Sequence, residues 1–493
     1  MCILGDLYFG VIRQHDAYDY TNMNILFSIL AILGVVLVFN FIIFVHELGH
    51  FWAAKWRGMQ VDRFQIWFGK PIWKKTIDGV QWGLGTIPLG GFVSLPEMAP
   101  MEAIEGEKLA PKESGKKITP LDKIIVAAAG PLFSFLLAFA AACIVWKVGR
   151  AEFPVTSTEI GYVQADSPAE KAGLKAGDTI VEIAGQRPAT FDGKFDAVTT
   201  MIALSAGELI EIKVERPGVE GLVTVNCGYE IPETSWYERK AMRRIGIAPK
   251  QDVFIGSVIE NSPAAKAGLQ QGDQITKVNG QPATSFLSVQ DMTKESAEAV
   301  LYTILREGET REVSITPVFP RLPKDYDRKL IGINFAIDNG AELFYSHPNP
   351  FDQMTEAGTF MWKSLQAVAN RKTSLDVQHF SGPIGIGKQM YDLLTIKDGW
   401  RELIWFLVIF NVNLAIFNLL PFPVLDGGHI VLSIAEWVRG RPAPLKILEV
   451  IQTAFVAVLF SLFLFISSKD LGDNFGKVFG GKPKSTAPQK IEF

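Results

Sequence analysis

Four apolar runs divide the chain, and each is long enough to cross a membrane. They cover residues 25–45, 124–146, 403–420 and 447–466. An α-helix rises about 1.5 Å per residue, so about 20 apolar residues cross a hydrocarbon core about 30 Å thick. The pattern predicts transmembrane helices over residues 24–50, 122–148, 400–430 and 447–468. The first run is too long for a signal peptide, and no small-residue cleavage site follows it.

Lysine and arginine near the ends of these runs predict the topology, because cytoplasmic loops of membrane proteins carry an excess of both. The relevant residues are Lys55, Arg57, Arg63, Lys116, Lys117, Lys123, Arg439, Arg441 and Lys446. The connections 51–121 and 431–446 are therefore expected to face the cytoplasm, and the block from about 150 to 400 to lie outside. The tail, residues 469–493, also falls outside on an even count of spans, although its lysines fit that placement poorly.

The first 23 residues show no clear pattern. Met23 directly precedes the first predicted span, residues 24–50, so a misplaced start site would account for what precedes it. We treat residues 1–23 as an N-terminal extension.

An internal repeat occupies the block between the second and third runs. Residues 167–191 and 262–286 share the pattern SPAxKAGLxxGDxI, about 95 residues apart. A repeat of this length indicates two copies of a domain rather than a solenoid. Each copy combines a short helix, a Gly-Asp turn and alternating β-runs, which resembles the circularly permuted PDZ domains of bacteria. We therefore predict PDZ domains over residues 155–235 and 245–320.

Two roles are open for these predicted domains. PDZ domains bind extended peptides by adding a strand to a sheet edge. Alternatively, the pair serves as a spacer or steric shield that restricts what can approach the membrane, with no bound peptide.

Composition agrees with a membrane protein and excludes several other classes. Charged residues make up 20% of the chain, below the roughly 25% of soluble proteins. Lys plus Arg is 48 and Asp plus Glu is 52, for a net charge of −4, and this balance argues against a nucleic-acid partner. The three cysteines provide neither a disulfide framework nor a CxxC metal site.

The motif His46-Glu47-Leu48-Gly49-His50 ends the first predicted span. Residues i and i+4 share a helix face, so both imidazoles can reach one metal ion, and Glu47 can reach a metal-bound water. This is the HExxH arrangement of zinc hydrolases. Ionisable residues at a membrane span are costly unless they have a function, which favours a zinc site over interface histidines held by hydrogen bonds.

A catalytic zinc usually takes three protein ligands and keeps a fourth position for water. Residues 418–429, directly after the third run, read NLLPFPVLDGGH. The two prolines end or kink the helix, which leaves Asp426 in irregular backbone at membrane depth. Such backbone is tolerated only where it is buried in protein or lines a polar cavity. Asp426 is the preferred third ligand, His429 is its rival, and an exposed cytoplasmic turn is the alternative to both.

Together these features resemble the site-2 proteases: HExxH at the end of a first span, NxxPxPxxLDG after a third, and two PDZ copies between spans two and three. Within that family the chain is most similar to the regulator of sigma-E proteases of Gram-negative bacteria, over residues 24–470. The resemblance implies His46, His50 and Asp426 as zinc ligands and Glu47 as the general base. It also implies substrate contacts for Asn418 and, on the same helix, Asn413.

The resemblance completes the predicted fold. It implies a polytopic α-helical membrane protein with about four transmembrane helices, a membrane-re-entrant β-loop and two tandem periplasmic PDZ domains. The β-loop corresponds to residues 63–69 and 82–93, within the region 51–121. Close relatives carry Gly at the position of Trp67, which puts the local strand geometry in question.

The connection before the third span, residues 321–398, is expected to be a linker with an amphipathic helix at 354–371. That helix either lies on the membrane surface or packs on the second PDZ copy. The segment 381–385, SGPIG, matches the family and has either a substrate-side or a packing role.

The implied activity is that of a zinc metalloendopeptidase in the bacterial inner membrane, with its active site toward the cytoplasm and its PDZ domains in the periplasm. The expected substrates are single-pass transmembrane proteins: an anti-sigma factor already cut by a site-1 protease in the envelope stress response, and remnant signal peptides. Zn2+ is the expected cofactor, and membrane lipid is an expected partner. The alternatives are a non-proteolytic PDZ scaffold with a structural zinc, and a metal transporter, which would need several intramembrane ligand sets.

Overall fold

The computed structural model describes residues 25–98, 118–152, 157–192, 195–294, 296, 298–321, 329–336, 344–396, 398–441 and 444–475. The predicted extension 1–23, the tail beyond residue 475, and Lys116 and Lys117 lie outside the described residues.

Four of the described helices are long and apolar enough to cross a membrane, which confirms the prediction of four spans. They are α2 (Ile25–Arg57), α4 (Pro120–Val148), α11 (Gly399–Asn418) and α13 (Leu445–Phe475). Thr119 and Asp122 form a capping box around the start of α4, with Pro120 in its first turn. Such a box satisfies N–H groups that have no partner inside the helix, so the sequence marks where this span begins.

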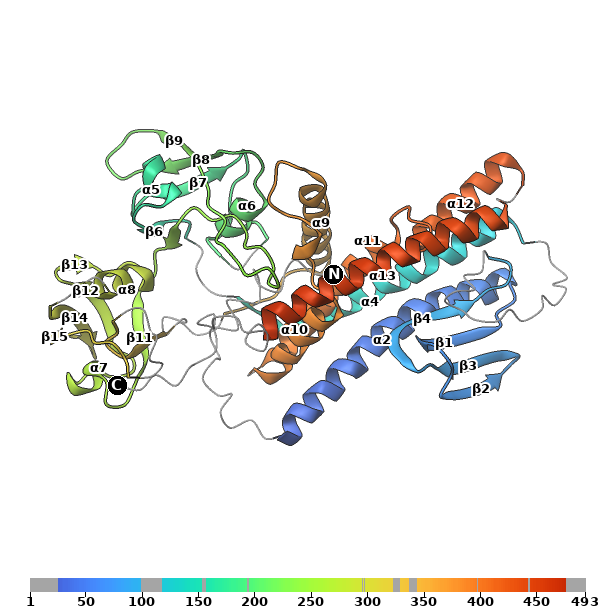
Figure 1. The fold of residues 1–493 in the computed structure, drawn as a ribbon, viewed down its shortest axis with the longest axis horizontal. Helices are drawn as coiled ribbons and strands as arrows, with labels where there is room; N and C mark the ends of the chain where they lie inside the picture. The colour runs from blue at the N-terminus through green and yellow to red at the C-terminus, as the bar shows by residue number, and fades with distance from the viewer. Residues whose placement is uncertain are drawn as a thin grey trace.

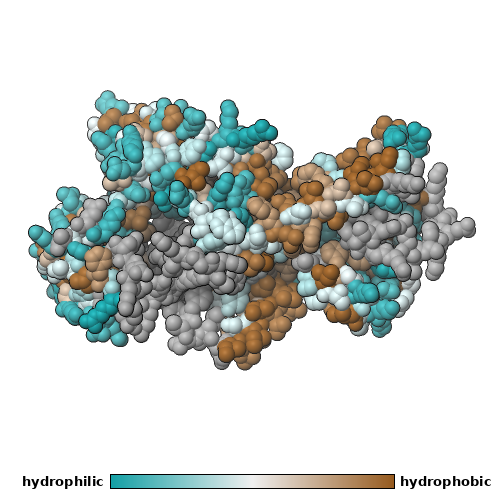
Figure 2. Space-filling model, viewed as in Figure 1, coloured by the Kyte–Doolittle hydropathy of each residue, from teal (hydrophilic) through white to brown (hydrophobic). Residues whose placement is uncertain are grey.

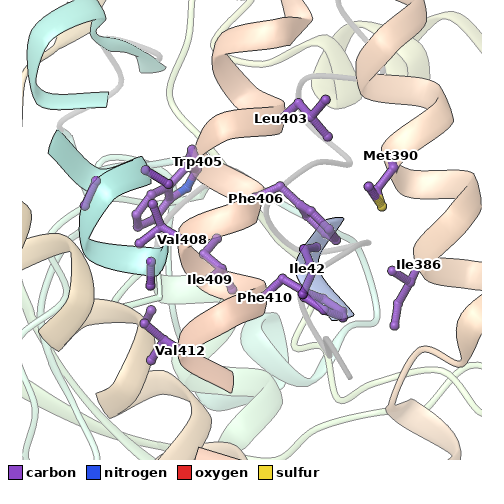
Figure 3. Packing of buried hydrophobic residues seen from close by; sticks show 14 of the residues in the cluster. Ile42, Ile386, Met390, Leu403, Trp405, Phe406, Val408, Ile409, Phe410 and Val412 are labelled. Carbon is purple, nitrogen blue, oxygen red and sulfur yellow. The ribbon is translucent and has the colours of Figure 1, made fainter. Parts of the chain in front are cut away.

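The central helix of the bundle is α11. In its most apolar 18-residue window 61% of residues are buried, against 11% in α2 and 17% in α13. It packs against α4, α9 (Pro350–Ala369) and α10 (Pro383–Thr395). Figure 3 shows Phe406 and Phe410 of α11 directed toward Ile42 of α2, with Met390 of α10 beyond. Close packing rather than water exclusion drives helix association in a bilayer, and this contact holds α2 against the centre.

The outward faces of the bundle are apolar. Leu33, Leu37 and Phe41 of α2 are each more than half exposed, as are Val458 and Phe460 of α13. Figure 2 shows hydrophobic side chains gathered over the helices, while the β-rich units at one end are mainly hydrophilic. These faces suit contact with lipid chains.

A four-stranded sheet lies beside the C-terminal part of α2, toward the opposite end of the bundle from the repeats (Figure 1). Its order is β2-β3-β1-β4, from β1 (Arg63–Phe68), β2 (Trp73–Ile77), β3 (Val80–Leu84) and β4 (Ile87–Ser94). Strand β1 runs parallel to β3 and antiparallel to β4. In this sheet β4 is therefore an edge strand.

Trp67 occupies a bulge in this sheet. The register between β1 and β4 shifts between Ile66 and Phe68, and Trp67 has a φ of 69°. This left-handed conformation costs a non-glycine residue roughly 1–2 kcal/mol, and glycine is the usual residue at such a bulge. The chain thus keeps the backbone geometry that glycine would favour, with tryptophan in its place.

The block between the second and third spans contains two β-rich units, each with its own hydrophobic core. The first comprises β6 (Ile160–Val163), α5 (Pro168–Ala172), β7 (Thr179–Ile183), α6 (Val198–Leu204), β8 (Ile210–Glu215), β9 (Leu222–Cys227) and β10 (Ile247–Pro249). The second comprises β11 (Val253–Val258), α7 (Pro263–Lys266), β12 (Gln274–Val278), β13 (Gln281–Pro282), α8 (Phe286–Lys294), β14 (Val300–Arg306), β15 (Glu309–Ile315) and β16 (Ile333–Ala336). The PDZ assignment of both units stays a prediction.

Both units extend beyond the predicted ranges. Strand β10 pairs with β6, and β16 pairs with β11, so each unit is closed by a strand from beyond residue 235 or 320. The closing strands lie in the related segments Ile245-Gly-Ile247 and Ile331-Gly-Ile333. A long connection separates each closing strand from the rest of its unit. The sequence pattern therefore does not reveal this second part of the repeat.

The same ion pair fixes the Gly-Asp turn in both units. Arg216 donates to Asp178 at 2.7 Å, and Arg306 donates to Asp273 at 2.6 and 2.7 Å. Each arginine also donates to the carbonyl that ends the preceding short helix, that of Gly173 or Gly268. Both aspartates are 1% exposed. The aspartate of each repeated Gly-Asp turn is therefore a buried charge that is paired with an arginine.

Outside the repeats, β5 (Arg150–Glu152) pairs with β17 (Phe344–Ser346), so the two ends of the repeat block lie together. The linker contains α9, the short 3-10 helix η2 (Val377–His379) and α10. Helix α9 packs on α4 and α11. After the third span, α12 (Asp426–Arg439) occupies much of the predicted loop 431–446 and ends at Gly440, which has a φ of 68°.

Substitution Arg306→Ala should destabilise the second unit by roughly 3 kcal/mol, because Asp273 would stay buried without a counter-charge. Arg311→Ala is the matched control: its pair with Glu309 is exposed, and such pairs contribute at most about 1 kcal/mol. Hydrogen exchange of the β14 amides in the full-length protein measures both effects. Equal protection in the two variants would contradict this account of the turn.

Candidate active site

Three side chains from two distant parts of the chain converge near the C-terminal end of α2. His46 Nε2 lies 3.3 Å from Asp426 Oδ2, and His50 Nε2 lies 3.3 Å from Asp426 Oδ1. The two Nε2 atoms are 3.4 Å apart. His46 is buried and the other two are partly buried. The structure therefore brings together all three residues that the sequence nominates as metal ligands.

Helix α4 orients both imidazole rings through contacts with their Nδ1 atoms. His50 Nδ1 lies 2.8 Å from the carbonyl of Val126, and His46 Nδ1 lies 3.0 Å from Ser134 Oγ. A carbonyl oxygen only accepts, so His50 Nδ1 carries the proton and its Nε2 presents a lone pair. Such contacts set the tautomer and orientation of metal-binding histidines. Both Nε2 atoms consequently point at Asp426.

The two helices approach closely because each has a glycine at the contact: Gly49 of α2 faces the backbone of Ala129, and Gly130 of α4 faces the His50 ring. A Cβ on Gly49 would lie 2.4 Å from the carbonyl oxygen of Ala129, and one on Gly130 would lie 2.1 Å from His50 Nε2. Neither distance is possible for real atoms. Gly130 thus leaves the space that the His50 ring occupies, and small residues are the usual means of close helix approach in membranes.

Asp426 is held by a tight loop that depends on the following two glycines. It opens α12, where the positive end of the helix dipole stabilises a carboxylate. A Cβ on Gly427 would lie 2.3 Å from the carbonyl oxygens of Leu419 and Leu420, and one on Gly428 would lie 2.0 Å from that of Phe422. The loop therefore folds back on the start of α12, and this brings Asp426 toward α2.

The geometry of the three donors fits a zinc ion. Zinc–ligand bonds of about 2.0–2.1 Å at tetrahedral angles place neighbouring ligand atoms about 3.3 Å apart. The two Nε2 atoms are 3.4 Å apart, and each lies 3.3 Å from a different oxygen of Asp426. One ligand atom from each of the three residues lies within 4.8 Å of the other two. Buried Asp426 Oδ2 accepts no hydrogen bond of normal geometry from the described residues. Two imidazoles and one carboxylate are also ligand types that zinc takes in catalytic sites.

Glu47 lies on the same helix, next to the first ligand, and faces the four-stranded sheet. A Cβ on Gly91 of β4 would lie 3.2 Å from Glu47 Cγ. The edge strand therefore lies against the side chain of Glu47.

The two candidate substrate residues, both on α11, do not share a helix face. Asn418 is the last residue of that helix and is partly buried, while Asn413 is 3% exposed. Five residues at about 100° each place them about 140° apart around the helix. One extended substrate strand lying on that helix would therefore not meet both.

The other described histidines are not part of the cluster. His429 lies one turn beyond Asp426 and is not among the residues that meet there. His347 Nδ1 lies 2.9 Å from the carbonyl of Trp146, and His379 Nε2 lies 3.1 Å from that of Lys240. Both are held by backbone groups elsewhere in the structure.

The sequence reasoning did not identify Val126, Gly130 and Ser134, the α4 residues that shape the site. They are four residues apart, so they form one stripe along the helix. The signal available was a small-residue face with a glycine-proline pair, Gly130-Pro131, inside an apolar span.

The sequence matches peptidase family M50 over residues 34–462. A regulator of sigma E protease from Haemophilus influenzae is 32% identical over 447 residues, covering 86% of this chain and 95% of the relative. The regulator of sigma-E protease RseP of Escherichia coli is 29% identical over 460 residues, covering 89% and 97%. A Vibrio cholerae protein named as a zinc metalloprotease is 28% identical over 448 residues, covering 87% and 96%.

Substitution Ser134→Ala should weaken zinc binding roughly 10–100-fold, because the His46 ring would lose the group that orients it. Ser461→Ala is the matched control: that hydroxyl bonds only to the backbone of its own span, α13. Competition against a fluorescent zinc chelator in detergent measures both affinities. Unchanged affinity in Ser134→Ala would show that the hydroxyl does not position the ligand.

Proposed function

Because the chain belongs to peptidase family M50, the family of the site-2 proteases, we propose that it hydrolyses peptide bonds within the transmembrane segments of single-pass membrane proteins. The chain is a multi-pass membrane metalloendopeptidase of this type. The observation that carries the proposal is the convergence of Asp426, at the start of α12, on His46 and His50 of the candidate membrane span α2, where Glu47 adjoins His46 in the sequence.

In the proposed site His46, His50 and Asp426 hold the metal. Zinc bound there supplies a Lewis acid that polarises the scissile carbonyl and lowers the pKa of a bound water toward about 7. The described residues at this cluster provide three ligands, whereas structural zinc sites are usually closed by four. Three ligands suit a catalytic site, with the remaining position left for water or substrate, rather than a scaffold with a structural metal.

Glu47 acts as the general base in this proposal. Its carboxylate accepts a proton from the attacking water and then delivers it to the leaving amine, as a positioned acid–base group does in peptide hydrolysis. Its place beside His46 on the same helix puts it within reach of a water at the ligands.

The edge strand β4 offers a means of holding the substrate. A transmembrane helix keeps its carbonyls in internal hydrogen bonds, so a substrate must unwind before attack. An extended segment can add to a sheet edge through main-chain hydrogen bonds, and β4 lies against the side chain of Glu47 at Gly91. We propose that the unwound substrate lies along β4 and that Asn418 contacts its backbone near the scissile bond.

We propose that the substrates include an anti-sigma factor already trimmed by a site-1 protease, and remnant signal peptides. The printed names of two relatives, which refer to regulation of sigma E, support this choice. In this proposal the protein lies in the bacterial inner membrane, with its site toward the cytoplasm and both repeats in the periplasm. The sheet and the repeats lie toward opposite ends of the bundle (Figure 1), which agrees with that arrangement.

Substitution Glu47→Gln should reduce cleavage of a single-pass model substrate by at least about 10²-fold, since the general base is lost. Zinc should stay bound, because all three ligands remain. Glu97→Gln is the matched control: this carboxylate accepts from the Gln60 backbone, and an amide oxygen can replace it. Cleavage by purified protein in detergent, with and without a chelator, measures the effect, and normal cleavage by Glu47→Gln would contradict the mechanism.

Replacing residues 155–336 by a short linker should remove discrimination against untrimmed substrates, if the repeats act as a size filter. The pairing of Glu152 with Phe344 brings the two ends of this block together, so a short linker can join them. The intact protein should cut a trimmed substrate at least about tenfold faster than one with a folded outer domain. The shortened protein should cut both equally, and retained discrimination would rule out the filter.

A further inference from the structure

A loop of the first repeat reaches the end of the fourth span. Residues 228–246, between β9 and β10, pack on the last turns of α13. Lys469 Nζ donates to the carbonyls of Trp236 at 2.6 Å and Glu238 at 3.0 Å. A Cβ on Gly472 would lie 2.0 Å from the carbonyl oxygen of Tyr237. The loop backbone thus lies directly against the helix.

An ionic cluster fixes this contact. Arg239 pairs with Asp470 and with Asp473, the latter at 2.6 Å, and donates to the carbonyl of Gln378 at 2.7 Å. Asp470 is fully buried and also accepts from the backbone of Gly385 at the start of α10. Paired, hydrogen-bonded charges of this kind hold one geometry, so the loop has a defined position.

This position lies at the boundary between apolar and polar parts of the span. The apolar run of α13 ends at Ile466, and Ser467, Ser468 and Lys469 follow. On the same side of the bundle, Trp146 is 56% exposed near the end of α4 and Trp400 is 44% exposed at the start of α11. Tryptophan gathers at membrane–water interfaces, so these residues mark the interfacial layer.

The loop carries the most exposed tryptophan of the described residues. Trp236 is 87% exposed, and its ring meets that of Tyr237 edge to face at 5.6 Å. An indole ring has an apolar body and one polar N–H, which suits a layer that is part lipid and part water. A rigid loop that carries such a ring at the level of Lys469 suits the lipid interface better than free water.

We propose that Trp236 and Tyr237 insert into the interfacial layer of the outer leaflet and anchor the first repeat to the membrane surface. The partner is the lipid interface itself, continuous with the lipid-facing surface of α13. The inference depends on α13 as a membrane span and not on peptidase activity.

Insertion of Trp236 and Tyr237 sets the distance of both repeats from the membrane surface. The second repeat contacts the first through Thr284, whose hydroxyl donates to the carbonyl of Gly161 on β6 at 2.5 Å. A fixed first repeat therefore also limits where the second one sits above the bundle.

A nitroxide at position 235 tests the proposal, since exposed Ser235 adjoins Trp236 and leaves it intact. The full chain is used, with Cys2, Cys143 and Cys227 replaced by alanine, Ser235→Cys labelled, and one copy per lipid nanodisc. Collisions with nickel chelated to a lipid headgroup are measured by power saturation. Val219→Cys is the control label, because Val219 is 49% exposed in the β8–β9 connection.

The label at 235 should collide with lipid-bound nickel at least threefold more often than the label at 219. Adding Trp236→Ser should bring the two rates together. The proposal is overturned if lipid-bound nickel does not collide with the label at 235, whether water or protein surrounds that label. Unchanged collisions after Trp236→Ser overturn the role of the tryptophan, since the loop would then stay at the membrane without it.

Discussion

The close contact between α2 and α4 is the interaction on which the candidate site depends. At Gly49 the backbone of α4 lies so close that no Cβ would fit, and at Gly130 the His50 ring occupies the place of a side chain. This approach lets α4 present a carbonyl and a hydroxyl to the two imidazoles. In a bilayer there is no water-driven force between helices, so small residues and interhelical hydrogen bonds must stabilise such a contact. The contact that packs these spans is thus the same contact that orients the metal ligands.

The third ligand, Asp426, approaches from the opposite side of the site, and a different structural feature positions it. Asp426 begins a helix after a broken segment, and the carbonyls of Leu419 and Phe422 pack where side chains of Gly427 and Gly428 would otherwise stand. Irregular backbone at membrane depth is tolerated only where protein or a polar cavity surrounds it. Because the ligands belong to separate elements, bound metal would also hold α12 against α2. Metal binding and the packing of the bundle are therefore coupled.

Much of this arrangement was predictable from the sequence, for identifiable reasons. The spans follow from run length alone, and the convergence of His46, His50 and Asp426 follows from helix periodicity together with the broken motif after the third span. The strands that close the two repeats were not predicted, because long connections separate them from their units. Ser134 and Gly130 were not predicted as site residues, because the sequence of an apolar span does not show what its small residues contact. Helix α12 was not predicted over residues 431–439, because the basic residues near them led us to assign this segment to a cytoplasmic connection.

The central claim is that α2 and α12 jointly hold one zinc ion with an open position. Zinc K-edge X-ray absorption of the purified full-length protein, with zinc content measured per chain, tests it directly. The account predicts one zinc per chain bound by four nitrogen or oxygen atoms at about 2.0–2.1 Å, two of them imidazole nitrogens. Replacing Asp426 by asparagine should weaken binding while leaving the two-imidazole signature in the residual metal. A sulfur ligand, a third imidazole, or zinc content and spectrum unchanged in Asp426→Asn would contradict the account.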